Sequence, residues 1–333
     1  MAKASLNRYF QISPLIVIIL FFILPVFISS QYILHLFVLA FLYSVLAMNF
    51  DLAYGYLGLI NFGYASLFGV GAYTSALLSM HLRISPWLSI FVGGALAVLI
   101  CIPIGFACLR VRGHYLAIVT LGLGEILRII YSRALEPWTL GMSGLWGIPP
   151  FPNIQIPFLG TIDFSGVDRV PYYYLTLTIL LVITLMEYKL VKSKVGIMFR
   201  SIREDEEAAK SLGIDTVRYK LMGFVISGFF AGMMGGVYAH YLVVLIPDLL
   251  GIGKTVEILT MTLIGGAGTL FGPIIGAFIL IYVSEFLRFL AGLRFIVFGI
   301  FIVLVVIFWP KGVIGIPDYL RSLSEKTSKK EKR

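Results

Sequence analysis

The chain has 333 residues, of which 59% are hydrophobic and only 13% are charged. Soluble proteins average roughly 45–50% apolar and about 25% charged residues, so a water-soluble enzyme or binding domain is excluded. The net charge of +9 does not indicate nucleic-acid binding. The basic residues gather in a few loops and in the tail, as they do in the cytoplasmic loops of membrane proteins.

Apolar stretches that are long enough to cross a bilayer follow one another along the chain. A membrane-spanning helix needs about 20 apolar residues, so the pattern predicts an all-α polytopic membrane protein with about eight to ten transmembrane helices. We expect the first stretch to be a retained span, because it is too long for a signal peptide and no clear cleavage site follows it. The predicted spans are 12–30, 32–51, 56–80, 86–109, 114–132, 171–190, 221–245 and 294–310, together with the irregular stretch 256–288.

The distribution of Lys and Arg predicts the orientation of these spans. Most basic residues, including those in the loop 192–220, lie on the cytoplasmic side if the N-terminus is inside. We therefore expect one transmembrane domain over residues 1–320 and a basic cytoplasmic tail over 321–333, in the plasma (inner) membrane with both termini in the cytoplasm. The loop 133–170 is rich in proline and glycine, and we expect it to be external with little regular structure.

Glycine-rich segments interrupt two of the apolar stretches. As a single helix, 256–288 would be roughly 50 Å long, well beyond a hydrocarbon core of about 30 Å, and its middle, GGAGTLFGP, should break a helix. We expect this segment to enter the membrane and return to the same side. An earlier stretch, 61–73, shares the pattern G-x-x-[ST]-L-F-G with it, which indicates either an internal repeat around a substrate path or close helix packing through small residues. The predicted helix breaks are Gly63, Gly69, Gly266, Gly268, Gly272 and Pro273.

No catalytic constellation is visible in the sequence. GIGKT at 251–255 ends like a phosphate-binding loop, but Asp248 stands where that motif needs its first glycine. The four histidines are scattered, and no H-E-x-x-H or C-x-x-C pattern occurs. We therefore expect no catalytic residue, no metal ion and no cofactor in this chain.

Few ionisable groups lie within the predicted spans. They include Asp51, the pair Glu125 and Arg128, and the pair Glu285 and Arg288. Each pair has i, i+3 spacing and can neutralise itself on one helix; the alternative is a polar path through the membrane. Buried amide and hydroxyl side chains must find hydrogen-bond partners. They can either line such a polar path or form contacts between helices. The candidate pathway residues are Asn49, Asn61, Thr120, Glu125 and Thr269.

The stretch SIREDEEAAKSLGID, residues 201–215, carries a dense cluster of mixed charge between two apolar runs. Ser201 or Asp205 can cap a short helix over 203–212, Gly213 can end it, and Asp215 can cap the next helix. A solvated loop helix is one interpretation. The other is a docking element for a cytoplasmic protein, formed by Arg203, Asp205, Glu207, Ala208, Ala209, Leu212 and Gly213.

Glu207–Gly213, EAAKSLG, matches the E-A-A-x-x-x-G loop of permease subunits in ABC importers, where the loop is a coupling helix seated on the ATPase. GLINFGYASLFGVGAYTSALL, GHYLAIVTLGLGEILR and LIGGAGTLFGPIIGA resemble the branched-chain amino acid permease family, and the resemblance extends over roughly 45–290. The chain departs from that pattern at Tyr64, where His is frequent, and at Phe271, where Trp is common. The distal Leu-Pro of the general importer motif is missing as well.

This resemblance implies an ATP-driven importer of branched-chain or related hydrophobic amino acids. It further implies a second, related permease subunit, two cytoplasmic ATPase subunits that hold ATP and Mg²⁺, and an external substrate-binding protein. A permease of the same family for urea or short-chain amides is one alternative. The other is a secondary transporter driven by an ion gradient, with Asp51 or Glu125 as its titrating or cation-binding group.

Overall fold

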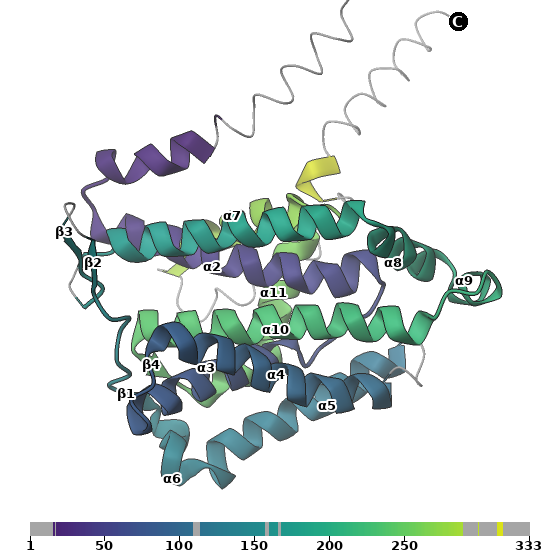
Figure 1. Ribbon diagram of the computed structural model, residues 1–333, viewed down its shortest axis with the longest axis horizontal. Coiled ribbons are helices and arrows are strands. Elements are labelled where there is room, and N and C mark those ends of the chain that lie inside the picture. The colour runs from purple at the N-terminus through teal and green to yellow at the C-terminus, as the bar shows by residue number, and fades with distance from the viewer. Residues whose placement is uncertain are drawn as a thin grey trace, which may run out of the picture.

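The computed structural model describes residues 16, 18–108, 114–156, 160–165, 168–288, 299 and 312–315, and it is a helical bundle (Figure 1). Apart from Gly299, the predicted span 294–310 lies outside the described residues, as does the predicted tail 321–333. Within the described residues, five helical segments are long and apolar enough to cross a membrane: Gln31–Tyr56, Pro86–Pro103, Tyr115–Ala134, Val170–Lys192 and Thr216–Leu242.

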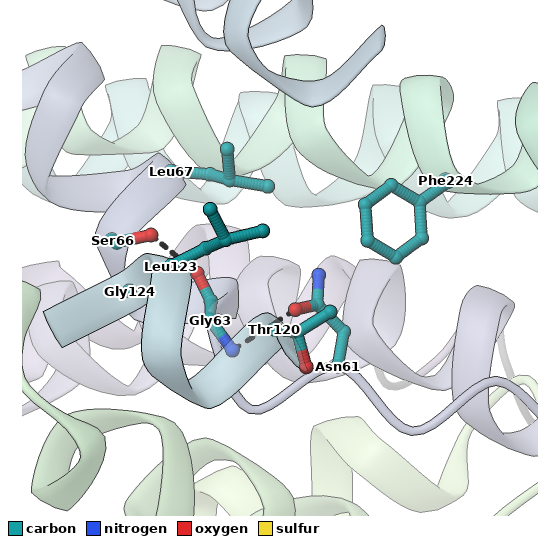
Figure 2. Close-up of a pocket in the computed structure, with 8 residues that line it drawn as sticks. All are labelled: Asn61, Gly63, Ser66, Leu67, Thr120, Leu123, Gly124 and Phe224. Carbon is teal, nitrogen blue, oxygen red and sulfur yellow. Dashed lines mark hydrogen bonds between the residues drawn. The ribbon is translucent and has the colours of Figure 1, made fainter. Parts of the chain in front are cut away.

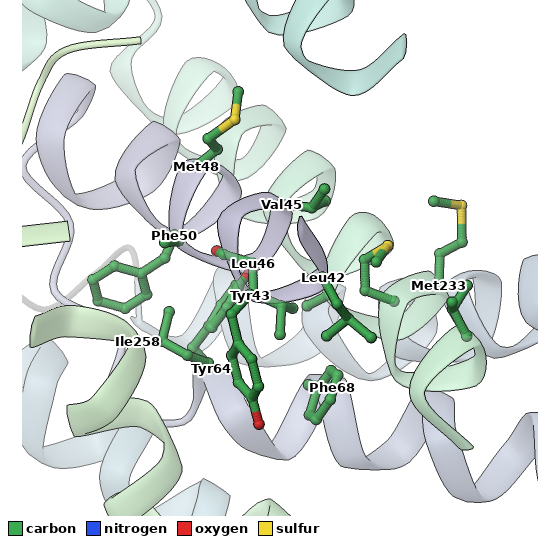
Figure 3. Close-up of a cluster of buried hydrophobic side chains, with 14 of the residues drawn as sticks. Leu42, Tyr43, Val45, Leu46, Met48, Phe50, Tyr64, Phe68, Met233 and Ile258 are labelled. Carbon is green, nitrogen blue, oxygen red and sulfur yellow. The ribbon is translucent and has the colours of Figure 1, made fainter. Parts of the chain in front are cut away.

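Helix α2 (Gln31–Asp51) forms the centre of the bundle, and every residue from Ala40 to Asp51 is buried. A helix that is apolar on all sides is expected to be enclosed by others. Its neighbours are α7 (Val170–Lys192), α10 (Thr216–Leu242), α11 (Ile252–Gly265) and α12 (Gly272–Phe286). Figure 3 shows part of this core, where Leu42 and Leu46 of α2 lie near Phe68 and Ile258.

Helix α10 also packs closely on α3 (Tyr64–His81) and α4 (Pro86–Cys108). A Cβ atom added at Gly71 would collide with the backbone of Gly232, and one added at Gly235 would collide with the carbonyl oxygen of Phe68. Small residues therefore bring the three helix backbones together, as they commonly do in membrane bundles.

The predicted span 56–80 is wrong at its start. The chain continues from α2 into the π-helix η1 (Leu52–Tyr56), residues 57–63 are irregular, and α3 begins only at Tyr64. Gly63 precedes α3, but Gly69 lies within it, so the helix break predicted at Gly69 is also wrong. Gly69 has a packing role instead, because the side chain of Leu250 occupies the place that a Cβ atom would need.

The stretch 256–288 is broken where its glycines predicted. Helix α11 ends at Gly265, Gly266 and Gly268 have positive φ, and α12 begins at Gly272 with Pro273 in its first turn. Because α12 ends where Glu285 accepts a hydrogen bond from Tyr32, near the start of α2, the chain turns back on itself at 266–271. The earlier glycine-rich stretch is mostly helical, so the two shared patterns do not occupy equivalent local structures.

The loop 133–170 has more regular structure than predicted. After α5 (His114–Ile129) and the π-helix η2 (Ile130–Ala134) come α6 (Glu136–Thr139) and the 3₁₀-helix η3 (Gly141–Ser143). Two short antiparallel ladders follow: β1 (Leu145–Trp146) pairs with β4 (Val244–Leu245), and β2 (Ile154–Ile156) pairs with β3 (Gly160–Ile162). Cross-strand pairing satisfies backbone groups that the many prolines and glycines would otherwise leave open.

Helices α8 (Lys194–Glu204) and α9 (Glu206–Ser211) lie at the end of the bundle opposite to the β ladders (Figure 1). The 3₁₀-helix η4 (Pro247–Leu250) packs on α3 and α5 and leads into α11. The 3₁₀-helix η6 (Val313–Gly315) follows Gly312, which contacts Gly265 and Gly266 beside the α11–α12 turn.

Replacing Gly71 by alanine should lower the stability of the folded chain, because the added methyl group meets the backbone of Gly232 and cannot be accommodated by a side-chain rotation. Overpacking of this kind costs about 1–3 kcal/mol. Thermal unfolding in detergent measures the loss. The matched control is Gly122→Ala on α5, where nothing lies within 4 Å of the new Cβ atom; a lower unfolding temperature for the control, or none for Gly71→Ala, would contradict the packing analysis.

Candidate functional site

The charged segment 201–215 folds as a sharp corner between two helices. Asp205 has extended backbone geometry, and its carboxylate accepts hydrogen bonds from the N–H groups of Glu207 (2.9 Å) and Ala208 (3.0 Å). Asp205 is therefore the N-cap of α9, one of the two caps that the sequence allowed. The predicted helix 203–212 is wrong at its start, because α8 runs through Arg203 to Glu204 and α9 begins only after the cap.

The C-terminal side of α9 follows the sequence prediction. Gly213 has φ +82° and ends the helix, and Asp215 caps α10 by accepting a hydrogen bond from the N–H of Arg218 (3.1 Å). The two helices α9 and α10 are thus joined by a short connection with defined geometry at both of its ends.

Helix α9 is also fixed to α10 by an ion pair that sequence reasoning did not single out. The carboxylate of Glu206 accepts a hydrogen bond from Lys220 (2.5 Å) and pairs with Lys210 (3.1 Å). Partial burial opposes ionisation of Glu206, but the hydrogen bonds from Lys220 and Lys210 outweigh it, so the pKa of Glu206 lies below its usual value. Lys220 itself is buried, which makes this contact a firm link between the surface helix and the bundle.

The outer surface of the corner carries apolar side chains. Leu212 is 81% exposed, and Ile197 of α8 and Val217 of α10 are exposed as well. Of the predicted small stripe, Ala208 and Leu212 face outward, whereas Ala209 is buried against the corner. Leu212 is an exposed apolar residue within the segment 201–215 that the sequence predicts as a docking element.

Arg203, the last arginine of α8, reaches from the corner into the bundle. Its guanidinium donates a hydrogen bond to the carbonyl oxygen of Gly55 in η1 and lies beside Gly268 of the α11–α12 turn. The N–H of Gly268 is within 2.9 Å of both carboxylate oxygens of Asp51 at the end of α2. A Cβ atom at Gly55 would collide with that carboxylate. One buried carboxylate, one arginine and two glycines therefore connect the corner with both interrupted membrane segments.

Two of the predicted pathway residues, Asn61 and Thr120, line one small cavity (Figure 2). The Thr120 hydroxyl accepts a hydrogen bond from the N–H of Phe62 (3.0 Å), and the Asn61 side chain accepts one from the N–H of Gly63 (3.0 Å). The cavity measures about 10 Å³, which is at the lower limit for one water molecule. It is lined by Asn61, Gly63, Ser66, Leu67, Thr120, Leu123, Gly124 and Phe224.

The structure does not bring the other predicted pathway residues to this cavity. Asn49 is fully buried, and its amide donates to the carbonyl oxygen of Val45 one turn earlier (2.9 Å). The Thr269 hydroxyl donates to the carbonyl oxygen of Gly266 (2.6 Å) inside the α11–α12 turn. Glu125 pairs with Arg128 (2.6 Å), which also reaches Asp248 of η4 (3.3 Å).

A further charged pair was missed: Lys254 precedes the predicted stretch 256–288, and Glu257 is the second residue of that stretch. Lys254 and Glu257 belong to α11, with 2.6 Å between Nζ and a carboxylate oxygen. Lys254 also donates to the hydroxyl of Tyr43 (2.9 Å), which lies near the middle of α2. Their i, i+3 spacing, the same as in Glu125 and Arg128, was the available signal.

Comparisons with known proteins agree with this architecture. The family described as the branched-chain amino acid transport system / permease component matches residues 32–309. The chain belongs to this family. It is therefore a multi-pass membrane protein of the permease class, and the resemblance found in the sequence is confirmed.

Relatives of this chain are named for different substrates. The chain is 32% identical to the high-affinity branched-chain amino acid transport system permease protein LivM of Escherichia coli, over 83% of this chain and 68% of LivM. It is 22% identical to the permease protein LivH of the same organism, over 83% of this chain and 92% of LivH. It is also 30% identical to the guanosine ABC transporter permease protein NupQ of Bacillus subtilis, over 55% of this chain and 59% of NupQ. No solved structure matches the chain.

Glu206→Gln should lower the stability of the chain at neutral pH, because the ion pair with Lys220 loses its negative partner. Since the pKa of Glu206 is lowered in the folded protein, the pair stabilises the fold above the ordinary glutamate pKa of about 4.3. That stabilisation is lost as the pH falls through the lowered folded value. Unfolding temperatures at several pH values should therefore differ between wild type and variant at pH 7 and converge only as the pH falls below about 4. A difference that persists unchanged at low pH would show that the ion pair does not stabilise the corner.

Proposed function

We propose that the chain is the transmembrane permease subunit of an ATP-driven importer for branched-chain or related hydrophobic amino acids. The family match over residues 32–309 and the identity to LivM support this assignment. The observation that carries it is the α8–α9 corner, because a permease driven by a separate ATPase needs a rigid element on which that ATPase can push. Anchored by Glu206 and exposing Leu212, the corner meets this requirement.

The proposed complex contains a second permease related to LivH, two cytoplasmic ATPase subunits and an external substrate-binding protein. ATP and Mg²⁺ bind to the ATPase subunits, and this chain supplies no nucleotide site. The segment Gly251–Thr255 forms the start of α11, where the Thr255 hydroxyl accepts a hydrogen bond from Ala65 and Lys254 bonds to Tyr43. Both side chains contact other helices of the bundle in the described structure. Both chain termini are on the cytoplasmic side, together with the corner.

The corner has two routes into the bundle in this proposal. Through Glu206, Lys220 and the Asp215 cap, a movement of α9 is transmitted to α10, which packs on α3 and α4. Through Arg203, the same movement reaches Gly55 of η1 and the α11–α12 turn at Gly268. A rigid displacement of packed helices of this kind is a common form of switching between two states. The small-residue contacts of α10 keep its backbone in register with its neighbours during the movement.

An ion-gradient-driven carrier is less well supported. Such a carrier would need Asp51 or Glu125 as a titrating or cation-binding group. Both oxygens of Asp51 are directed at the N–H of Gly268, and Glu125 is paired with Arg128. Neither group is therefore poised to exchange a proton or a cation with the path, and the family match favours the ATP-driven class.

Gly213→Val should strongly reduce ATP-driven uptake by the reconstituted complex. A β-branched residue at φ +82° is strained, so α9 can no longer end and turn into α10 at this position. Transport into vesicles and ATP hydrolysis stimulated by the binding protein should both fall at least tenfold. The matched control is Gly147→Val in the loop 133–170, where φ is +75° and nothing lies within 4 Å of a Cβ atom. Equal losses in the two variants would attribute the effect to general misfolding and contradict the coupling role.

Arg203→Leu should separate the two activities of the complex. Because the hydrogen bond to Gly55 and the positive charge beside Gly268 are lost, hydrolysis continues while uptake per ATP falls severalfold. The control is Lys194→Leu, which removes a cation from the first turn of the same helix. Uptake per ATP, measured in vesicles, should remain at the wild-type value in the control. If Arg203→Leu keeps the wild-type uptake per ATP, Arg203 does not transmit the movement of the corner.

A further inference from the structure

We propose that Lys254 and Glu257, together with the hydroxyl of Tyr43, form a subsite on the translocation path for the carboxylate and ammonium groups of a zwitterionic amino acid. This inference rests on the proposed importer function and names the substrate class of its path. Such a subsite distinguishes an amino acid from an uncharged solute such as a nucleoside, for which some relatives are named.

The first observation is the depth of the pair. Lys254 bonds to Tyr43, which lies near the middle of the 21-residue helix α2. That helix is about 31 Å long at 1.5 Å per residue, close to the thickness of a hydrocarbon core of about 30 Å. The ion pair therefore lies near the middle of the membrane and away from its interfaces, where charged groups on a helix are most costly.

The second observation is that the pair is not sealed inside this chain. The side chain of Lys254 is 22% exposed and that of Glu257 is 27% exposed, and Ile252 and Val256 of the same helix are exposed beside them. A charged group facing lipid at this depth costs about 2.5–3.5 kcal/mol. This face of α11 therefore borders water or another protein, as a path between two permease subunits requires.

Further charged side chains lie close to the start of α11, on the N-terminal side of the Lys254–Glu257 pair. Arg128 and Glu125 of α5 and Asp248 of η4 form a linked group, and Arg128 approaches Gly251 at the start of α11. Side chains of both signs thus follow one another along α5, η4 and α11. Such a row of charges of both signs can attract a solute that carries both charges toward the Lys254–Glu257 pair.

The chemistry favours a zwitterion over other solutes. An incoming carboxylate can take the place of Glu257 at Lys254, while the attached ammonium binds the released Glu257, so no charge remains unpaired. A solute with one charge leaves one member of the pair uncompensated, and an uncharged solute gains nothing from separating them. Tyr43 is buried with its hydroxyl at Lys254, so it holds the lysine in position during the exchange.

A variant tests the charge requirement. In vesicles that contain the whole complex and saturating loaded binding protein, Glu257→Gln should lower the uptake rate of the amino acid at least tenfold, while ATP hydrolysis stimulated by the binding protein is kept. Glu257→Asp, which retains the charge, should recover most of the uptake. The matched control is Glu285→Gln, which alters an i, i+3 pair at the end of α12; its uptake should be unchanged. If Glu257→Gln takes up the amino acid at the wild-type rate, the proposed subsite is wrong. If the wild-type complex itself shows no ATP-driven uptake, the proposed function is wrong.

Thiol labelling tests the path independently of transport rates. Val256→Cys, in a background with Cys101 and Cys108 replaced and uptake retained, should react with a charged, water-soluble thiol reagent, and the transported amino acid should slow the reaction. The control is Val182→Cys on α7, which is 51% exposed and lies at a similar depth, because α7 runs parallel to α2 with Thr184 beside Met48. The control should remain unlabelled. An unreactive Val256→Cys, or a reaction that the amino acid does not slow, would overturn the subsite.

Discussion

The contact between Asp51 and the N–H of Gly268 is the constraint on which the rest of the arrangement depends. A buried carboxylate must find donors, and here the donor is the backbone of a turn that joins two short helices. The turn is thereby held at the end of the central helix, and the glycines at 55 and 268 leave the space for it. Because Arg203 enters the same place from the α8–α9 corner, the two interrupted segments and the corner are linked at one point.

The corner has a defined geometry, and most of its side chains are exposed to solvent. The cap at Asp205, the positive φ of Gly213 and the ion pair between Glu206 and Lys220 fix α9 on α10 from three directions. A flexible segment would absorb a push from a partner, whereas an anchored one passes the displacement on to the helices behind it. In the proposed complex, the exposed Leu212 would give the partner an apolar contact, and the links between α9 and α10 would transmit a displacement of α9.

Local chemistry explains which parts of this structure the sequence could predict. Apolar length predicted the membrane helices, and glycine patterns predicted the end of α9 and the break at 266–271, because these features depend on neighbours in the chain. The late start of α3 and the helical conformation of Gly69 depend on contacts with Thr120 and Leu250, which are remote in sequence. The links of Glu206 with Lys220 and of Lys254 with Tyr43 likewise join residues from different helices. Periodicity carries no signal for such contacts.

In the proposed mechanism, a force acts on one end of the bundle, and the substrate passes along a polar face formed by α5, η4 and α11. The central claim of this mechanism is that the nucleotide-driven force enters this chain at the α8–α9 corner. The most direct measurement is the reactivity of Leu212→Cys toward a water-soluble thiol reagent, compared between the chain alone and the complete complex in vesicles. We expect the cysteine at position 212 to be labelled readily in the chain alone and to be strongly protected once the ATPase subunits are bound. Equal labelling in both states would mean that the ATPase engages another surface, and the claim would be wrong.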